Sequence, residues 1–183
     1  MNSASRFIFL SLLFLHVGCD SKPPAPPGNP KVELGELYKA GKALQDAVQA
    51  AGNVPEQATF LRLQTAFKDQ IQAVDGRPEK EKKRLSPFAT RYAKVDAVYD
   101  MAAKALDLSL RLEKCRMEGT PRVCREKFDS ESNEMYSAII DSAALRGACR
   151  QCDPTSKGTV GEIFARALEM HATADQRLLR NMP

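Results

Sequence analysis

Residues 88–112 read FATRYAKVDAVYDMAAKALDLSLRL, and their spacing sets the expected architecture of the chain. The apolar side chains recur in steps of four, three, four, three and four residues, which is the heptad spacing of helices packed in a bundle. The members of this seam are Phe88, Tyr92, Val95, Tyr99, Ala102 and Leu106. The pattern predicts a long central helix with one continuous apolar face.

Four further segments have the same helical period, and no run of alternating β-branched residues predicts a strand. In chain order they are residues 32–51, the segment between Pro55 and Asp75, the segment after Gly119-Thr120-Pro121, and the segment that opens at Thr159. Short turns join them, which favours antiparallel neighbours. The sequence therefore predicts an all-α fold, an antiparallel helical bundle of about five helices over residues 32–183.

Local signals predict where two helices start, but they do not decide whether the fourth helix is continuous. Ser86 before Pro87 fits an N-cap followed by a first-turn proline, so the central helix is expected to begin there after a short charged turn. Thr159 and Glu162 have the spacing of a capping box. Residues 129–134, DSESNE, are mostly middling helix formers, so the fourth helix is either continuous or broken at this point.

The N-terminal segment has the order of an export signal. Arg6 precedes the apolar residues 7–17, a run shorter than the ~20 residues that span a bilayer, and Gly18 stands before Cys19. This order resembles the lipobox of bacterial lipoproteins, with His16 where that motif usually has leucine. The resemblance implies cleavage before Cys19, acyl chains such as palmitate on the new N-terminus, and anchoring in the cell membrane.

Together with the proline content of residues 21–30 and the helical periodicity that follows, this resemblance divides the chain into three regions. Residues 1–18 are the expected signal peptide, residues 19–31 the lipidated N-terminus and proline-rich tether, and residues 32–183 the helical domain. An extended proline-rich tether of ~3.1 Å per residue holds a domain ~30 Å from the bilayer. Ordinary signal-peptidase cleavage after Cys19 is the alternative, and both cuts place the mature chain in an oxidising compartment, the periplasm. Asp20, directly after the cysteine, is similar to the residue that retains many enterobacterial lipoproteins in the inner membrane. That sorting rule varies among bacteria, so the choice of inner or outer membrane stays open.

Four cysteines remain for disulfides if Cys19 carries the anchor. Cys115 and Cys124 flank the Gly-Thr-Pro turn and are the preferred pair, because the two helices of a hairpin bring them face to face. Cys149 and Cys152 would then pair locally. A bond between Cys124 and Cys149 requires a break in the fourth helix, since an unbroken helix separates them by ~37 Å.

Two alternative functions depend on single features. The spacing of Cys149 and Cys152 is typical of thiol–disulfide redox modules, but the negative charge of Asp153 opposes thiolate formation. His171 is the only histidine after the signal and lies on the seam of the last helix. It would be the axial ligand if the bundle held haem or another small ligand, and a core histidine with one hydrogen bond is the simpler interpretation.

Charge and motifs argue against other classes of protein. Arg6 is one of 27 basic residues and no acidic residue precedes Asp20, so the mature chain carries 26 basic and 23 acidic residues and a net charge of +3. No basic stripe with interleaved aromatics predicts nucleic-acid binding. No hydrolase, phosphate-loop or di-iron pattern is present. We expect a non-catalytic lipoprotein, without metal or cofactor, whose bundle binds another cell-envelope component.

The most basic segment, residues 77–91, contains the run EKEKKR. Its acidic residues offset part of the positive charge, which favours a solvated helix start. Contact with anionic lipid head groups near the anchor is the alternative interpretation.

Overall fold

The computed structural model describes residues 28–146 and 152–182. All regular elements in these two ranges are helices, so the expected all-α fold is confirmed. The helices are α1 (Pro30–Glu33), α2 (Gly35–Ala50), α3 (Gln57–Gln72), α4 (Glu79–Glu118), α5 (Pro121–Asp141) and α6 (Lys157–Leu179). The signal peptide, most of the tether and Cys149 lie outside the described residues.

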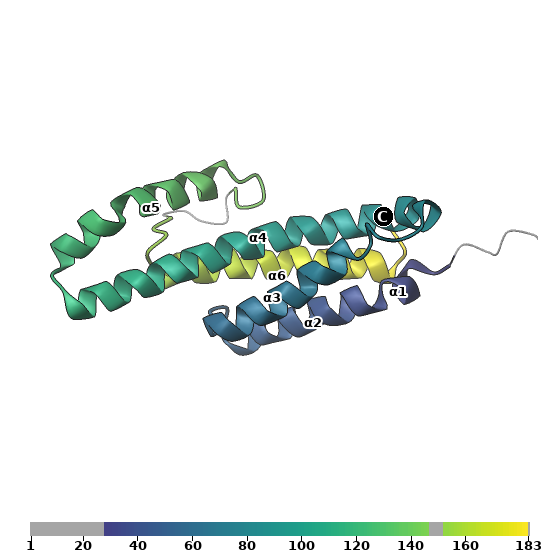
Figure 1. Cartoon of the computed structure of the whole chain (residues 1–183), viewed down its shortest axis with the longest axis horizontal. Coiled ribbons are helices and arrows are strands. Elements are labelled where there is room, and N and C mark those ends of the chain that lie inside the picture. Colours follow the sequence, from purple (N-terminus) through teal and green to yellow (C-terminus); the bar gives the residue numbers. More distant parts are fainter. Residues whose placement is uncertain (1–27, 147–151, 183) are drawn as a thin grey trace, which may run out of the picture.

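Helix α4, with 40 residues, is the central element, and α6 runs beside it in the opposite direction (Figure 1). Helices α2 and α3 form a hairpin that packs against this pair and completes the main bundle. Helix α5 lies apart from that hairpin and folds back along the C-terminal half of α4 (Figure 1). The molecule is thus an antiparallel bundle with an α4–α5 arm.

The predicted seam of α4 forms the centre of the core, and all six of its members are buried. Phe60 of α3 meets Phe164 of α6 edge to face with their ring centroids 5.0 Å apart, next to Tyr99. Such aromatic pairs contribute about 0.5–1.5 kcal/mol beyond the area that they bury. A separate small cluster of Leu108, Leu112, Cys124 and Phe128 joins α5 to α4.

The start of α4 differs from the prediction. The helix begins at Glu79, and Pro87 lies inside it instead of in its first turn. An interior proline removes one backbone hydrogen bond. Leu85, which is fully buried, and Arg84, which pairs with Glu33 of α1, hold the first two turns on the bundle in spite of that loss.

The capping prediction for the last helix was wrong by one turn. Ser156 is the N-cap of α6, and its Oγ accepts a hydrogen bond from the backbone N–H of Thr159 at 3.1 Å. The predicted helix over residues 32–51 is also divided, because the backbone leaves the helical conformation at Leu34 between α1 and α2.

The fourth predicted helix, α5, is continuous through residues 129–134. Two side-chain hydrogen bonds at i, i+4 spacing, from Ser130 to Glu134 at 3.2 Å and from Asn133 to Asp129 at 3.2 Å, lie along this polar segment. The break that a bond between Cys124 and a later cysteine would need is therefore absent.

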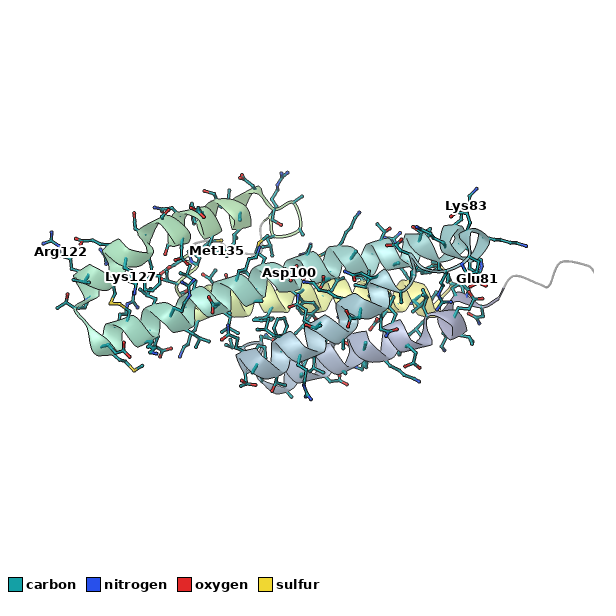
Figure 2. The ribbon with its side chains drawn as sticks, in the orientation of Figure 1. Glu81, Lys83, Asp100, Arg122, Lys127 and Met135 are labelled. Atoms are coloured by element: carbon teal, nitrogen blue, oxygen red, sulfur yellow. A yellow bond between two sulfur atoms is a disulfide. The ribbon has the colours of Figure 1, made fainter. Side chains whose placement is uncertain are left out.

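The chain enters the bundle at the end where α1 and the start of α4 meet. Arg77 donates a hydrogen bond of 2.8 Å to the carbonyl oxygen of Glu33, and Arg84 donates one of 2.7 Å to the carbonyl oxygen of Gly28. Figure 2 shows Glu81 and Lys83 at this end and Arg122 at the opposite end, on the arm. The N-terminal segment therefore leaves from the end that carries the most basic part of the sequence.

Candidate functional site

The tip of the α4–α5 arm is closed by a disulfide between Cys115 and Cys124, as the sequence predicts. Their sulfur atoms are 2.12 Å apart and their Cα atoms 5.8 Å apart. Gly119 ends α4 and Thr120 precedes α5, so the turn places the two cysteines on facing sides of the hairpin. The bond fixes α5 against α4 beside Phe128, where the small second core lies.

Replacing both Cys115 and Cys124 with alanine is expected to loosen the arm more than the bundle. Closing a loop this short contributes on the order of 2 kcal/mol, so amides of α5 should exchange roughly 30-fold faster with deuterium. Amides of α6 should keep their protection, because the core of the arm is separate from the main core. Equal acceleration in α6 would show that the arm and the bundle unfold together.

The other predicted cysteine sites are only partly within the described residues. Cys152 takes part in a disulfide. Cys149 and Cys19 lie outside the described ranges, so the local pairing of Cys149 with Cys152, the alternative of thiol exchange at that pair, and lipidation at Cys19 stay predictions. Asp153 accepts hydrogen bonds from the backbone N–H of Thr155 at 2.9 Å and from its hydroxyl at 2.5 Å, and so stabilises the turn before α6.

His171 is fully buried at the centre of the bundle. Its ring stacks on Phe67 at 5.1 Å between centroids and meets Tyr92 and Tyr99 edge on. Nδ1 lies 3.2 Å from the hydroxyl oxygen of Tyr99, within hydrogen-bond distance. Nε2 has no hydrogen-bond partner among the described residues, and the nearest carboxylate oxygen, on Asp175, is 3.8 Å away.

Burial controls the charges of this network. Burial and, to a lesser degree, the nearby positive charge of Lys42 together lower the pKa of His171 to about 4. Burial raises the pKa of Asp175 to about 6, opposed by the hydroxyl of Tyr92, which donates a hydrogen bond of 2.8 Å to the carboxylate. At neutral pH the core therefore holds an uncharged imidazole and a mostly ionised carboxylate.

The packing around Nε2 does not favour an axial haem ligand. A Cβ atom added to Gly41 of α2 would lie 2.6 Å from Nε2 and 3.0 Å from Cε1 of His171. No space for a methyl group is left there, so a metal ion on Nε2 would require α2 to separate from α6. The geometry supports the simpler interpretation, a core histidine that lies in close contact with a glycine.

No metal centre is evident elsewhere in the part of the chain that the structure describes. Residues 28–146 and 152–182 contain no group of three or more His, Cys, Asp or Glu side chains that could hold a metal ion.

The strongest candidate for a binding site is a groove of about 660 Å³ between α3, α4 and α5, which we call the arm groove. Its apolar lining includes Leu61, Ala103, Leu108, Met135 and Ala138. Figure 2 shows Met135 on the side of α5 that faces α4 and Asp100 further along α4. The groove is open to solvent, and Leu61 keeps 43% of its surface exposed.

Charged side chains of both signs border the arm groove. Gln64, almost fully buried on α3, donates hydrogen bonds to Asp96 at 3.0 Å and Asp100 at 2.7 Å, and so joins α3 to α4. Lys68 adds an ion pair of 2.6 Å to Asp100. Burial raises the pKa of Asp96, and the hydrogen bond from Gln64 opposes this shift.

The arm side of the groove is held in the same way. Arg111 of α4 pairs with Asp107 at 2.7 Å and with Glu131 of α5 at 2.5 Å. Lys104 also lines the groove and makes no hydrogen bond or ion pair through its side chain within the described ranges. The arrangement offers apolar contacts, one available cation and several fixed carboxylates, which suits a peptide or protein segment better than a small uncharged molecule.

Sequence reasoning missed this groove and the buried Gln64. The apolar residues of the α3 segment point to Leu63, but Gln64 is the residue that occupies the buried position between Phe60 and Phe67. Its spacing, four residues after one buried phenylalanine and three before the next, was the available signal. The groove itself has no sequence signal, because it depends on how far α5 diverges from the main bundle.

Comparisons with known proteins give no family for this chain. No family model matches it, and neither curated proteins nor solved structures give a significant match. In the described ranges, none of the helices combines the length and the apolar character needed to cross a membrane.

Proposed function

We propose that this protein is a bacterial lipoprotein, anchored through Cys19 in the cell membrane and facing the periplasm. Its helical bundle binds another protein of the cell envelope and has no catalytic role. The observation that carries the proposal is the arm groove, which lies open to solvent between α3, α4 and α5 and has apolar and charged walls.

The anchor and the disulfide both favour an exported protein. The order of the apolar run, Gly18 and Cys19 resembles a lipobox. The bond between Cys115 and Cys124 is of the kind that persists in oxidising compartments such as the periplasm. An arm held by a disulfide is a rigid support, and rigid supports reduce the entropy lost when a partner binds.

The exposure of α5 adds to the case for a protein partner. Only Cys124, Phe128 and Ile139 of α5 are buried. Tyr136 and Ile140 are about half exposed, at 45% and 50%. These two side chains do not line the arm groove, but exposed aromatic and aliphatic side chains are typical of protein interfaces. A partner segment in the arm groove would cover Leu61 and Met135 on the opposite walls.

Site-specific photo-crosslinking in the native cells tests the partner. A photoreactive amino acid at Lys104 or Ala138, both in the arm groove, should give crosslinks to the same envelope protein. The same amino acid at Lys39, which is exposed on α2, should give none. Crosslinks at all three positions, or at neither groove position, would contradict the proposed binding site.

A blocking variant completes the test. Ala138→Arg fills the groove with a long cation and should abolish the crosslink from Lys104. Ala43→Arg makes the same change on the exposed side of α2 and should leave that crosslink intact. Equal crosslinking in the two variants would show that the contact does not depend on the groove.

The lipid anchor is tested separately by the intact mass of protein extracted from membranes. The expected mass is that of residues 19–183 with acyl chains on Cys19. A chain that retains Met1, or that begins after Cys19, would disprove the lipidation.

A further inference from the structure

A second groove, of about 370 Å³, lies between α4 and α6, and we call it the basic groove. Arg91 and Lys94 of α4 and Arg166 and Arg177 of α6 line it, and Glu169 is the only carboxylate of that lining. The lining therefore has a net charge of +3. An uncompensated excess of this kind attracts anions.

Most of these cations have no partner within the described ranges. Arg166 is engaged, because it pairs with Glu169 at 2.8 Å and donates a hydrogen bond of 2.9 Å to the carbonyl oxygen of Ala144. The side chains of Arg91, Lys94 and Arg177 make no ion pair or hydrogen bond there. The Nε atom of Arg91 is buried and unsatisfied, which is unfavourable until an acceptor approaches.

The floor of the basic groove is apolar. Val95 and Ala174 are buried beneath it, and Met170 is half buried beside them. A ligand that fits has an anionic group for the guanidinium groups and a hydrocarbon part for the floor. Guanidinium groups match the oxygen atoms of phosphate in geometry, so a phosphate ester is the natural anion.

The basic groove lies near the end where the chain enters the bundle. Arg91 is two helical turns, about 10 Å, beyond Arg84, which contacts Gly28 and Glu33. The basic segment 77–91 that the sequence singles out therefore leads into the groove. If Cys19 carries an acyl anchor, the bilayer lies within ~30 Å of this end by the reach of the tether.

We propose that Arg91, Lys94 and Arg177 bind the phosphate of an anionic phospholipid, so that the α4–α6 face of the bundle rests on the membrane. This inference rests on the proposed lipid anchor, which makes the bilayer the nearest source of phosphate esters. It leaves the arm groove, between α3, α4 and α5, accessible for the protein partner.

The acylated protein is reconstituted in vesicles of phosphatidylcholine, with or without about one third phosphatidylglycerol, and treated with an amine-acetylating reagent. Acetylation of Lys94, followed by mass spectrometry, should slow roughly fivefold on the anionic vesicles. Lys114, which is exposed on the arm and makes no ion pair with the described residues, should react equally on both. The proposal would be overturned if Lys94 were acetylated at the same rate on both vesicle types, or if acetylation of Lys114 slowed as much as that of Lys94 on the anionic vesicles.

Charge-matched variants separate the groove from net charge. Arg91→Gln with Arg177→Gln should abolish the lipid dependence of Lys94 acetylation. Lys80→Gln with Lys83→Gln removes the same charge from the exposed start of α4 and should preserve it. Loss of the effect in both variants would assign it to overall charge. The comparison of the two vesicle types on the unaltered chain stays decisive even if a variant folds poorly.

Inorganic phosphate distinguishes the two sources of the anion. At millimolar concentration, with neutral vesicles, it should leave Lys94 acetylation unchanged. Protection equal to that on anionic vesicles would mean that the groove takes soluble phosphate, and the membrane proposal would be wrong.

Flotation distinguishes failure of the anchor from failure of the groove. The acylated protein should float with phosphatidylcholine vesicles. Failure to float would show that the chain carries no acyl groups and would overturn the proposed function. The lipid dependence of Lys94 acetylation is then measured on the fraction bound to anionic vesicles, and its absence would overturn the groove independently.

Discussion

Replacing Gly41 with valine is expected to destabilise the bundle by about 3 kcal/mol, because overpacking a closely filled core is unfavourable. An added Cβ atom would already lie 2.6 Å from Nε2 of His171 and 3.1 Å from Cε2 of Phe67. The imidazole has no room to move, since Phe67, Tyr92 and Tyr99 surround it. The free energy of unfolding, from urea denaturation, measures the effect.

Gly35 provides the matched control, because it belongs to the same helix and its added Cβ would meet no atom within 4 Å beyond the adjacent backbone of its own helix. Gly35→Val should change the free energy of unfolding by less than ~0.5 kcal/mol. In a chain that carries His171→Ala, the cost of Gly41→Val should fall below ~1 kcal/mol, because the closest contact is gone and Phe67, which stacks on the imidazole, gains space to move away. An unchanged cost would show that Gly41 is not needed for the imidazole.

The faces of the helices were predictable because helical periodicity is a local property of the sequence. The α4 seam is buried as predicted, and so is the seam of α6, which includes Phe164 and His171. The disulfide between Cys115 and Cys124 was predictable for the same reason, since a short turn between two helices leaves these cysteines little choice of partner.

The ends of the helices were less predictable, because several local signals compete and tertiary contacts select among them. Ser86 and Pro87 have the sequence of a helix start, yet the burial of Leu85 and the contact of Arg84 with Glu33 extend α4 to Glu79. Proline in a helix interior is unfavourable, and here packing outweighs it.

The buried polar contacts and the two grooves were not predictable, because they depend on which faces meet. Periodicity alone places Gly41 on the buried face of α2 and His171 on the buried face of α6. It does not reveal that the two residues oppose each other, or that the carboxylate of Asp175 accepts a hydrogen bond from the hydroxyl of Tyr92. Those facts require the relative positions of α2, α4 and α6.

Acidification is expected to act on this buried network in two opposite ways. The pKa of His171 falls from 6.5 in the unfolded chain to about 4 in the fold. The folded state therefore binds fewer protons between these values, and stability decreases as the pH falls from 6.5 towards 4. The pKa of Asp175 rises from 3.8 to about 6. Its folded state binds more protons, so stability increases as the pH falls from 6 towards 3.8.

The two effects nearly cancel in the unaltered chain, so single substitutions should reveal them. Asp175→Asn keeps an acceptor for the hydroxyl of Tyr92 and removes the titrating carboxyl, so only the histidine penalty remains. This variant should lose about 3 kcal/mol relative to the unaltered chain between pH 7 and pH 4, at 1.36 kcal/mol for each unit of pKa shift. His171→Gln keeps a polar partner for Tyr99 and should gain a similar amount over the same range.

Urea denaturation at each pH measures both variants against the unaltered chain. Comparison at equal pH is needed because surface carboxyls such as Glu56 and Glu131, whose pKa values are lowered by hydrogen bonds, titrate in all three proteins. Opposite slopes assign the pH dependence to His171 and Asp175, because a general loss of packing would shift both curves without changing their slopes. Parallel curves would mean that neither buried group changes its proton affinity on folding.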